Sequence, residues 1–215
     1  VCLDQLVNNA ANIRYMSGGQ FKVPIVFRGG NGIAHQLAAT HSHRVETIYA
    51  RIPGLVVVSP STPYDAKGLL KTSIRCDDPV IFLESEMLLG DKGEVPDEEY
   101  TLPLGKAHVE REGSEVTIIS YGKSMARFAR PATKVLVEEE GIDVELIDLR
   151  TLRPLDLPTI VNSVKKTNRC VIVSEDCGYC GMGGAILAQL QKPCFDYLDA
   201  PIENIHSDEI PVPFN

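Results

Sequence analysis

The chain has 215 residues, which is enough for one large domain or two modest ones, each with its own hydrophobic core. Its composition, 44% hydrophobic and 23% charged, is ordinary for a globular protein. A formal net charge of −8 argues against non-specific binding of nucleic acid, which needs clustered Lys and Arg. No apolar run approaches the ~20 residues that a membrane-spanning helix needs. We therefore expect neither a nucleic-acid partner nor a membrane partner.

The first hundred residues alternate between helical patterns and short apolar runs. Apolar residues recur at near-helical spacing over 4–15, and residues 55–58 form a continuous apolar run typical of a strand buried on both faces. Ser61 and Thr62 are candidate caps for the helix that follows them. In chain order the sequence predicts a helix at 4–15, a strand at 23–27, a helix at 44–51, a strand at 55–58, a helix at 64–75 and a strand at 80–83.

The alternation stops and then restarts in the second half. Residues 86–105 are acidic and rich in turn-forming Gly and Pro. Beyond them the sequence predicts strands at 116–120, 144–149 and 170–173, and helices at 124–139, 156–166 and 183–191. Pro131 predicts a kink or a broken turn in its helix. This pattern indicates an α/β fold with two parallel or mixed sheets, divided near residue 102 into domains at 1–102 and 103–215.

The cluster His41-Ser42-His43 has the residue types of proton-transfer chemistry. A His side chain titrates near neutral pH and can both donate and accept a proton. The alternative is a structural His that only hydrogen-bonds backbone, and composition alone favours it. The Gly-rich loop at 29–32 follows a strand, but it matches neither the dinucleotide fingerprint nor a phosphate loop. An ordinary turn is at least as good an interpretation of that loop.

Cysteines and a helix end give two further patterns. Six Cys lie mostly in apolar segments, which favours free thiols in a reducing compartment. Cys177 and Cys180 have the spacing of a redox pair or half a zinc site, although the following Gly-rich stretch indicates a tight strand-to-helix turn instead. The segment 73–79 ends a helix, where unpaired carbonyl oxygens are satisfied by water or by a hard cation.

Several strings, in one order along the chain, resemble the beta subunits of thiamine-diphosphate-dependent 2-oxoacid dehydrogenases. In the first half they are residues 15–20 (Tyr-Met-Ser-Gly-Gly-Gln), 23–29 (Val-Pro-Ile-Val-Phe-Arg-Gly), 38–42 (Ala-Ala-Thr-His-Ser), 53–55, 65–71 and 78–81. In the second half they are residues 147–156 (Ile-Asp-Leu-Arg-Thr-Leu-Arg-Pro-Leu-Asp), 163–167 and 197–201. The strings at 16–19 and 24–29 favour the pyruvate dehydrogenases over the branched-chain and acetoin dehydrogenases.

The resemblance implies a transketolase-like architecture, with an incomplete pyrimidine-binding domain followed by a transketolase C-terminal domain. It also implies a heterotetramer with an alpha subunit, and thiamine diphosphate with Mg²⁺ bound between the two subunits. The implied reaction is oxidative decarboxylation of pyruvate with acetyl transfer to lipoyl groups of an acyltransferase core. The alternatives are a branched-chain 2-oxoacid or acetoin dehydrogenase subunit, and a non-catalytic assembly subunit.

The resemblance assigns roles to a few residues and departs from the family at others. It matches His41 to the family's active-site His, and it matches a structural potassium site to Ile25, Ser73, Ile74, Cys76 and Asp78. The family's cofactor-contacting Glu lies upstream of Val1 and its C-terminal docking segment lies beyond Phe214, so we expect no cofactor-binding residue here. Gly30 stands where the family usually has Pro. Because no transit or signal segment is visible, we expect a bacterial cytoplasm rather than a mitochondrial matrix or plastid.

Overall fold

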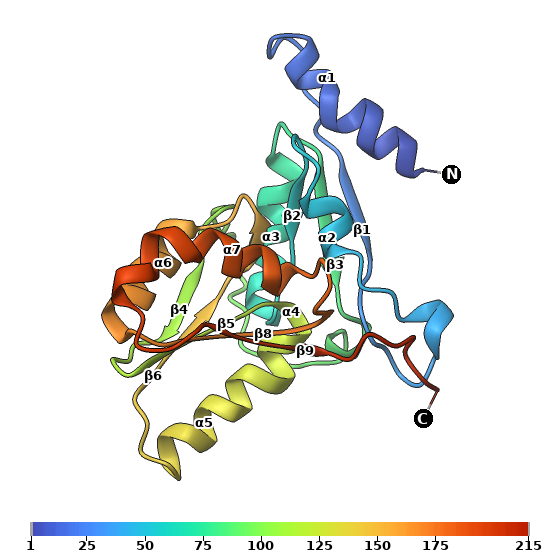
Figure 1. Cartoon of the computed structure of the whole chain (residues 1–215). Coiled ribbons are helices and arrows are strands. Elements are labelled where there is room, and N and C mark those ends of the chain that lie inside the picture. The colour runs from blue at the N-terminus through green and yellow to red at the C-terminus, as the bar shows by residue number, and fades with distance from the viewer. Residues whose placement is uncertain (1, 215) are drawn as a thin grey trace.

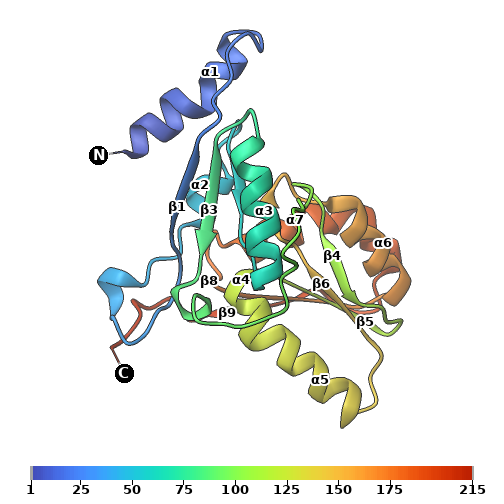
Figure 2. The same ribbon diagram turned by 180° about the vertical axis from the view of Figure 1, so that it is seen from behind.

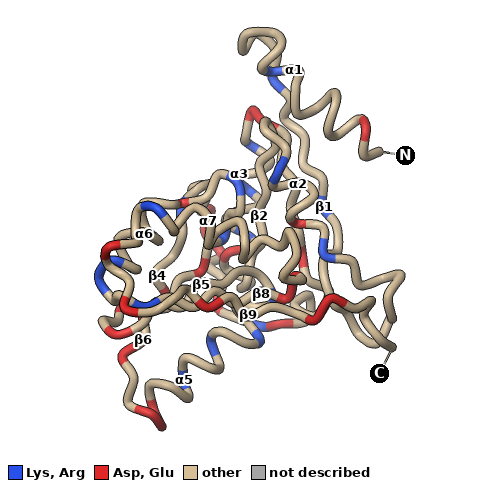
Figure 3. The backbone as a smooth tube through the Cα atoms, in the orientation of Figure 1, with Lys and Arg blue, Asp and Glu red and all other residues tan. Residues whose placement is uncertain are grey.

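The computed structural model describes residues 2–214 and contains two β-sheets (Figure 1). The first sheet has four strands in the order β1-β3-β2-β7, and the second has five in the order β4-β6-β5-β8-β9. The mixed α/β architecture confirms the predicted fold class. Figure 3 shows Lys and Arg scattered among Asp and Glu along the backbone, so the net charge of −8 is spread over the fold. Within residues 2–214, no helix is both long enough and apolar enough to cross a membrane.

The first sheet is built from three parallel strands. They are β1 (Val26–Gly30), β2 (Val56–Val58) and β3 (Val80–Glu84), with β3 between the other two. Helices α2 (Glu46–Ala50) and α3 (Pro63–Arg75) connect them. The hydroxyl of Thr62 caps α3 by accepting a hydrogen bond from the Asp65 amide at 3.0 Å, as the sequence predicted.

The fourth strand of this sheet comes from the second half of the chain. Strand β7 (Thr151–Arg153) pairs antiparallel with β2, at Val57 and Val58. Leu152, in the middle of β7, is 2% exposed and belongs to a hydrophobic core that also contains Ile81 from the first sheet and Ile119 from the second. The two sheets therefore share this hydrophobic core.

The second sheet is parallel except at one edge. Strands β5 (Val116–Ser120), β6 (Val144–Asp148), β8 (Cys170–Cys177) and β9 (Glu203–Ser207) run parallel, and β4 (His108–Arg111) runs antiparallel to β6. Helices α6 (Leu157–Thr167) and α7 (Met182–Cys194) cover one face, and α5 (Arg130–Glu138) covers the other (Figures 1 and 2). This double cover explains why the strands β5 and β6 are almost entirely buried.

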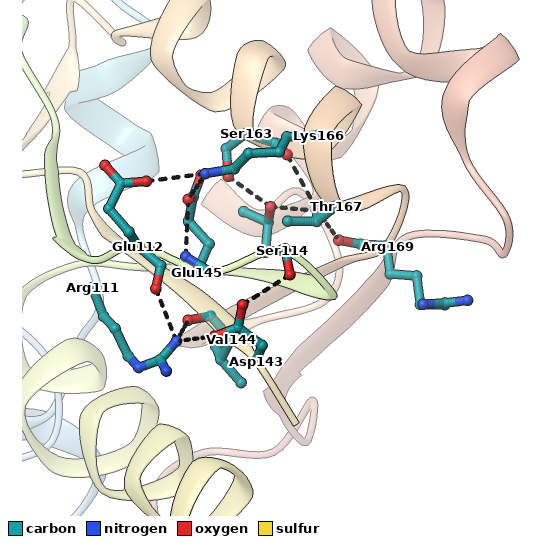
Figure 4. Close-up of polar contacts among 12 residues, drawn as sticks. Arg111, Glu112, Ser114, Asp143, Val144, Glu145, Ser163, Lys166, Thr167 and Arg169 are labelled. Carbon is teal, nitrogen blue, oxygen red and sulfur yellow. Dashed lines mark hydrogen bonds and ion pairs between the residues drawn. The ribbon is translucent and has the colours of Figure 1, made fainter. Parts of the chain in front are cut away.

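Polar contacts fasten α6 to the second sheet (Figure 4). The buried hydroxyl of Thr117 lies 2.7 Å from those of Ser163 and Thr167. Lys166 forms ion pairs with the buried Glu145 and with Glu112, the second at 3.0 Å. Each buried polar atom in this cluster therefore has a partner, which avoids the cost of an unpaired group in the interior.

The helix that contains Pro131 is irregular where the sequence predicts a break. It begins as α4 (Gly122–Ser124), widens into a π-helical turn at Met125–Ala129, and becomes regular again as α5. Pro131 comes just after the π-helical turn, so the irregular stretch lies one turn before the residue that lacks a helical N–H donor.

The N-terminal helix extends from the body beyond the first sheet (Figures 1 and 2). It comprises a π-helical segment, Gln5–Ala10, and α1 (Ala11–Met16), which confirms the predicted helix at 4–15. Its inner face packs closely, because a Cβ added at Gly54 would overlap the Ala11 carbonyl. Tyr15, by contrast, is 88% exposed.

The predictions that differ from the structure concern edges and short strands. The strand predicted at 23–27 begins only at Val26. Strands β4, β7 and β9 were not predicted, and two of them make the sheets mixed. The remaining predicted helices and strands of both halves are present within a few residues of the expected bounds.

Candidate functional site

His41 lies on an exposed loop at the carboxyl end of β1. The loop spans residues 31–45 between β1 and α2, and His41 ends a short 3₁₀ turn, Ala39–His41 (Figure 1). The loop and residues 212–214 line a cavity of about 310 Å³. Because ligands of open α/β sheets bind outside the carboxyl ends of the strands, this is the edge where chemistry is expected.

The backbone of this loop is locally strained. Gln36 and Ala38 both have positive φ angles, +47° and +60°, which side chains other than Gly rarely adopt. The Ser42 hydroxyl donates to the Ala38 carbonyl at 2.7 Å and steadies the turn. Strained conformations of this kind cost about 1–3 kcal/mol each and persist only where surrounding contacts fix them.

Hydrogen bonds close the base of the loop. The Asn31 side-chain oxygen accepts from the Val45 amide at 2.8 Å, and the Gly32 amide donates to the His43 carbonyl at 2.9 Å. The backbone amide of Asn31 donates to the Glu84 carbonyl of β3 at 2.8 Å. The two limbs of the loop are therefore joined to each other and to the first sheet.

Beneath the loop lies Glu46, a carboxylate with no solvent exposure. It accepts hydrogen bonds from the Asn31 side chain at 2.8 Å and from the Tyr121 hydroxyl at 3.0 Å. Burial raises the pKa of Glu46, and the nearby Asp176 carboxylate raises it further, against the lowering effect of these hydrogen bonds. Burial likewise raises the pKa of Tyr121. Both groups therefore favour their neutral forms more than they would in water.

A buried ion pair reaches the loop from the second sheet. Lys123, at the start of the helix after β5, pairs with Glu175 near the end of β8. Their side chains are only 3% and 7% exposed. Both also bond to the backbone of Ile33.

An open pocket of about 430 Å³ lies at the same edge of the first sheet. It is lined by Arg28, the backbone of Gly29 and Gly30, Glu84, Glu86 and Leu89. Arg28 is held by a two-pronged ion pair with Glu84, at 2.8 and 3.1 Å. A Cβ at Gly29 or Gly30 would meet no protein atom within 4 Å. This backbone is thus open to an approaching ligand or partner.

The five residues matched to a cation site gather at the opposite end of the first sheet. The Val23 amide donates to the Asp77 carbonyl and the Val80 amide to the Ile25 carbonyl, both at 2.9 Å, which brings the start of β1 against the end of α3. Ser73, Ile74 and Cys76 form that helix end. The printed carbonyls of this region already accept backbone hydrogen bonds, Ser73 from the Cys76 amide and Ile25 from the Val80 amide. The Asp78 carboxylate is already paired with Arg14 at 2.6 Å, so backbone oxygens would supply most ligands.

The Cys177 and Cys180 pattern leads into a tight turn before α7. Both thiols are free, and Cys177 donates a weak hydrogen bond to the Tyr179 carbonyl at 3.6 Å. Burial and the adjacent Asp176 raise the pKa of the Cys177 thiol, which disfavours a reactive thiolate. Among residues 2–214, no three His, Cys, Asp or Glu side chains are grouped so as to hold a metal.

A second polar cluster joins the sheets, and sequence reasoning did not single it out. Asp148, 1% exposed at the end of β6, accepts hydrogen bonds from the Ser61 hydroxyl and from the Arg150 amide at 3.0 Å. Arg150 forms a buried ion pair with Asp65 at 2.7 Å. Burial raises the pKa of Asp148 to about 7, with a further raising effect from Asp65, while the Ser61 hydrogen bond opposes the shift.

The chain matches two family models, one in each half. Residues 3–92 match the transketolase pyrimidine-binding domain, and residues 105–215 match the transketolase C-terminal domain. A solved structure titled "Split gene transketolase, inactive beta4 tetramer" superposes with a TM-score of 0.72 at 21% identity, over 97% of this chain and 65% of that chain. This likeness confirms the predicted transketolase-like fold.

Curated relatives are named pyruvate dehydrogenase E1 component subunit beta. The Rickettsia felis protein is 50% identical over 98% of this chain, and the Rhizobium meliloti protein is 49% identical over 99%. A mitochondrial subunit from Pisum sativum is 48% identical over 99%. The chain spans 64%, 46% and 60% of the lengths of these three relatives. The resemblance seen in the sequence is thus confirmed, and the chain belongs to the family of proteins that combine a transketolase pyrimidine-binding domain with a transketolase C-terminal domain.

Proposed function

We propose that the chain acts as the beta subunit of a pyruvate dehydrogenase. The observation that carries the proposal is the 50% identity to such a subunit over 98% of this chain. The reaction is oxidative decarboxylation of pyruvate, followed by transfer of the acetyl group to a lipoyl group on an acyltransferase core. We also propose that the chain divides near residue 102, a position between the two family-model matches.

The cofactor of this proposal is thiamine diphosphate with Mg²⁺, shared with an alpha subunit. Bound thiamine diphosphate supplies the nucleophilic carbon that adds to the keto group of a 2-oxoacid. The open pocket beside Gly29 and Gly30 fits this arrangement, because the sheet edge there leaves backbone and space toward a second subunit. This chain would cover the cofactor, and the alpha subunit would hold the diphosphate and the metal.

His41 is the residue to which we assign a direct part in acetyl transfer. It is exposed at the carboxyl edge of the first sheet, where an incoming lipoyl group can reach it. When the lipoyl disulfide opens, one sulfur takes the acetyl group and the other leaves as a thiolate. An imidazole at this place can donate a proton or hydrogen bond to that sulfur.

We further propose a structural potassium ion at the helix end that includes Ser73, Ile74, Cys76 and Asp78, beside Ile25. The support is the meeting of the two segments through backbone hydrogen bonds, together with the hard-cation preference for oxygen ligands. The site lies at the amino ends of the strands, away from His41, so its role is to stabilise the fold. The compartment we propose is a bacterial cytoplasm, because two of the relatives come from the bacteria Rickettsia felis and Rhizobium meliloti.

Reconstitution tests the proposed function. The chain is combined with an alpha subunit, thiamine diphosphate, Mg²⁺ and a lipoyl domain, and turnover is measured with pyruvate and with branched-chain 2-oxoacids. Preference for pyruvate is expected, and preference for a branched-chain acid, or for acetoin when it is supplied in the same assay, would replace the proposal. Unchanged activity without this chain would make it dispensable for catalysis. The chain alone is expected to be inactive, so turnover without an alpha subunit would contradict the shared cofactor site.

A further inference from the structure

The backbone N–H and C=O of Ile33 are both hydrogen-bonded to the two members of one ion pair. Lys123 Nζ donates to the Ile33 carbonyl at 2.8 Å, and the Ile33 amide donates to Glu175 Oε2 at 3.1 Å. Lys123 and Glu175 also pair directly with each other. The three groups form a closed set of contacts in which a loop of the first sheet meets two elements of the second.

The opposite limb of the same loop is attached to Glu175 as well. Arg44 donates through Nη1 to the Glu175 carbonyl at 2.9 Å. Glu175 therefore holds residue 33 with its carboxylate and residue 44 with its backbone. The tip between those positions contains the strained Gln36 and Ala38 and carries His41.

The packing around Glu175 leaves little freedom for a different arrangement. Gly32 has a φ of +81°, and a Cβ added there would overlap the Glu175 carboxylate. The side chains of Lys123 and Glu175 are almost fully buried, so neither charge can turn to water for a substitute partner. The ion pair and the loop consequently fit in one geometry.

We propose that the Lys123–Glu175 ion pair is a positioning device that fixes the loop at residues 31–45, and with it His41, against the second sheet. The link to acetyl transfer rests on the proposed function, whereas the fixing of the loop does not. Lys123 and Glu175 act through the loop backbone and are positioning residues rather than catalytic ones.

The test replaces both charges at once, in the complete enzyme assembled with its alpha subunit. Lys123→Met with Glu175→Gln keeps the side-chain length at residue 175 and shortens it by one atom at residue 123. It leaves no unpaired buried charge, which is the costly outcome of changing one partner alone. The Glu175 carbonyl, and its bond to Arg44, remain. The control is Arg150→Met with Asp65→Asn. This double variant removes another buried ion pair between the two halves of the chain, whose side chains are 13% and 3% exposed, and it does not involve the loop at 31–45.

The first measurement is amide hydrogen exchange over residues 31–45, with the buried strand at 116–120 as internal reference. We expect exchange in the loop to rise by about 10-fold or more in the Lys123/Glu175 variant and not in the control. The second is acetylation of a lipoyl domain compared with decarboxylation read by an artificial electron acceptor. We expect kcat for acetylation to fall by about 10- to 10²-fold, since small misplacements have effects of this size.

A His41→Ala background separates positioning from general damage. If the ion pair acts through His41, adding the Lys123/Glu175 variant to His41→Ala should cause no further loss of acetylation. Unchanged loop exchange would overturn the proposal, and so would a full additional loss in the His41→Ala background. If the wild-type enzyme does not acetylate lipoyl groups, the proposed function fails, and the exchange result alone then supports or overturns the fixing of the loop.

Discussion

Replacing Asp148 by Asn should remove a pH dependence of stability that the wild-type chain carries. Asp148 is buried at the end of β6, close to Asp65, and its pKa is about 7 instead of 3.8. Unfolding releases it to water and lowers the pKa again. Between these two values the folded chain holds a proton that the unfolded chain has lost.

The sign and the size follow from that difference. Because the folded pKa is the raised one, the contribution of Asp148 to stability is fully present below about pH 4 and is lost as pH rises through about 7. The shift of roughly 3 units corresponds to about 4 kcal/mol in all, at 1.36 kcal/mol per unit. Between pH 5 and pH 8, the part accessible to experiment, the loss is roughly 2.5 kcal/mol.

The assay is urea unfolding of the wild type and of Asp148→Asn at several pH values. Circular dichroism is the suitable signal, because the chain has no Trp. The free-energy difference between the two proteins should fall by roughly 2.5 kcal/mol from pH 5 to pH 8 and then level off. Ser61→Ala removes a hydrogen bond that lowers the pKa of Asp148. The pH above which the free-energy difference stops falling should therefore be higher in that variant. A flat difference across this range would mean that Asp148 is ionised throughout and would refute the reasoning.

Three other changes test separate parts of the structure. His41→Ala should slow lipoyl acetylation by about 10²–10⁴-fold, and more than it slows decarboxylation with an artificial acceptor, while His43→Ala should do much less; wild-type acetylation rates in His41→Ala would make that His structural. Potassium should raise the melting temperature of the assembled enzyme relative to a larger non-coordinating cation at equal ionic strength, because a ligand of the folded state stabilises it; equal melting temperatures would count against a bound ion. Leu69→Ala, at a fully buried position of α3, should lower the free energy of unfolding by about 2–5 kcal/mol in urea titrations; a loss below about 1 kcal/mol would show that the site collapses around the gap.

The long elements were predictable from the sequence because their local signals agree. In α3 the Thr62 cap, a Pro in the first turn and an apolar face all indicate the same helix. Strand β7 has three residues and gains its partner β2 through tertiary pairing, a signal that no local pattern contains. Strand β9 reads Glu-Asn-Ile-His-Ser and is mostly exposed, so it lacks the apolar run of a buried strand.

The candidate site, too, was predictable from the sequence only in part. His41 could be named from a matching string, but the groups that hold its loop are far apart in the sequence. Glu46, Lys123 and Glu175 look like ordinary surface charges when read singly. One usable signal was present: Glu175 and Asp176 come one residue after the apolar run at 170–173, near the carboxyl end of a strand. That end of a parallel sheet is its ligand-binding edge. That Glu46, Lys123 and Glu175 are buried could be known only from the three-dimensional structure.

The pairing of β7 with β2 bears on how the chain acquires its structure during synthesis. The first sheet cannot complete its outer edge until residues 151–153 have left the ribosome, long after β1, β2 and β3. Until then Val57 and Val58 present an unpaired apolar strand edge, the kind of surface that recruits other chains. A fragment ending near residue 102 would keep that edge permanently, so it should aggregate, and the two halves should unfold together as one cooperative unit.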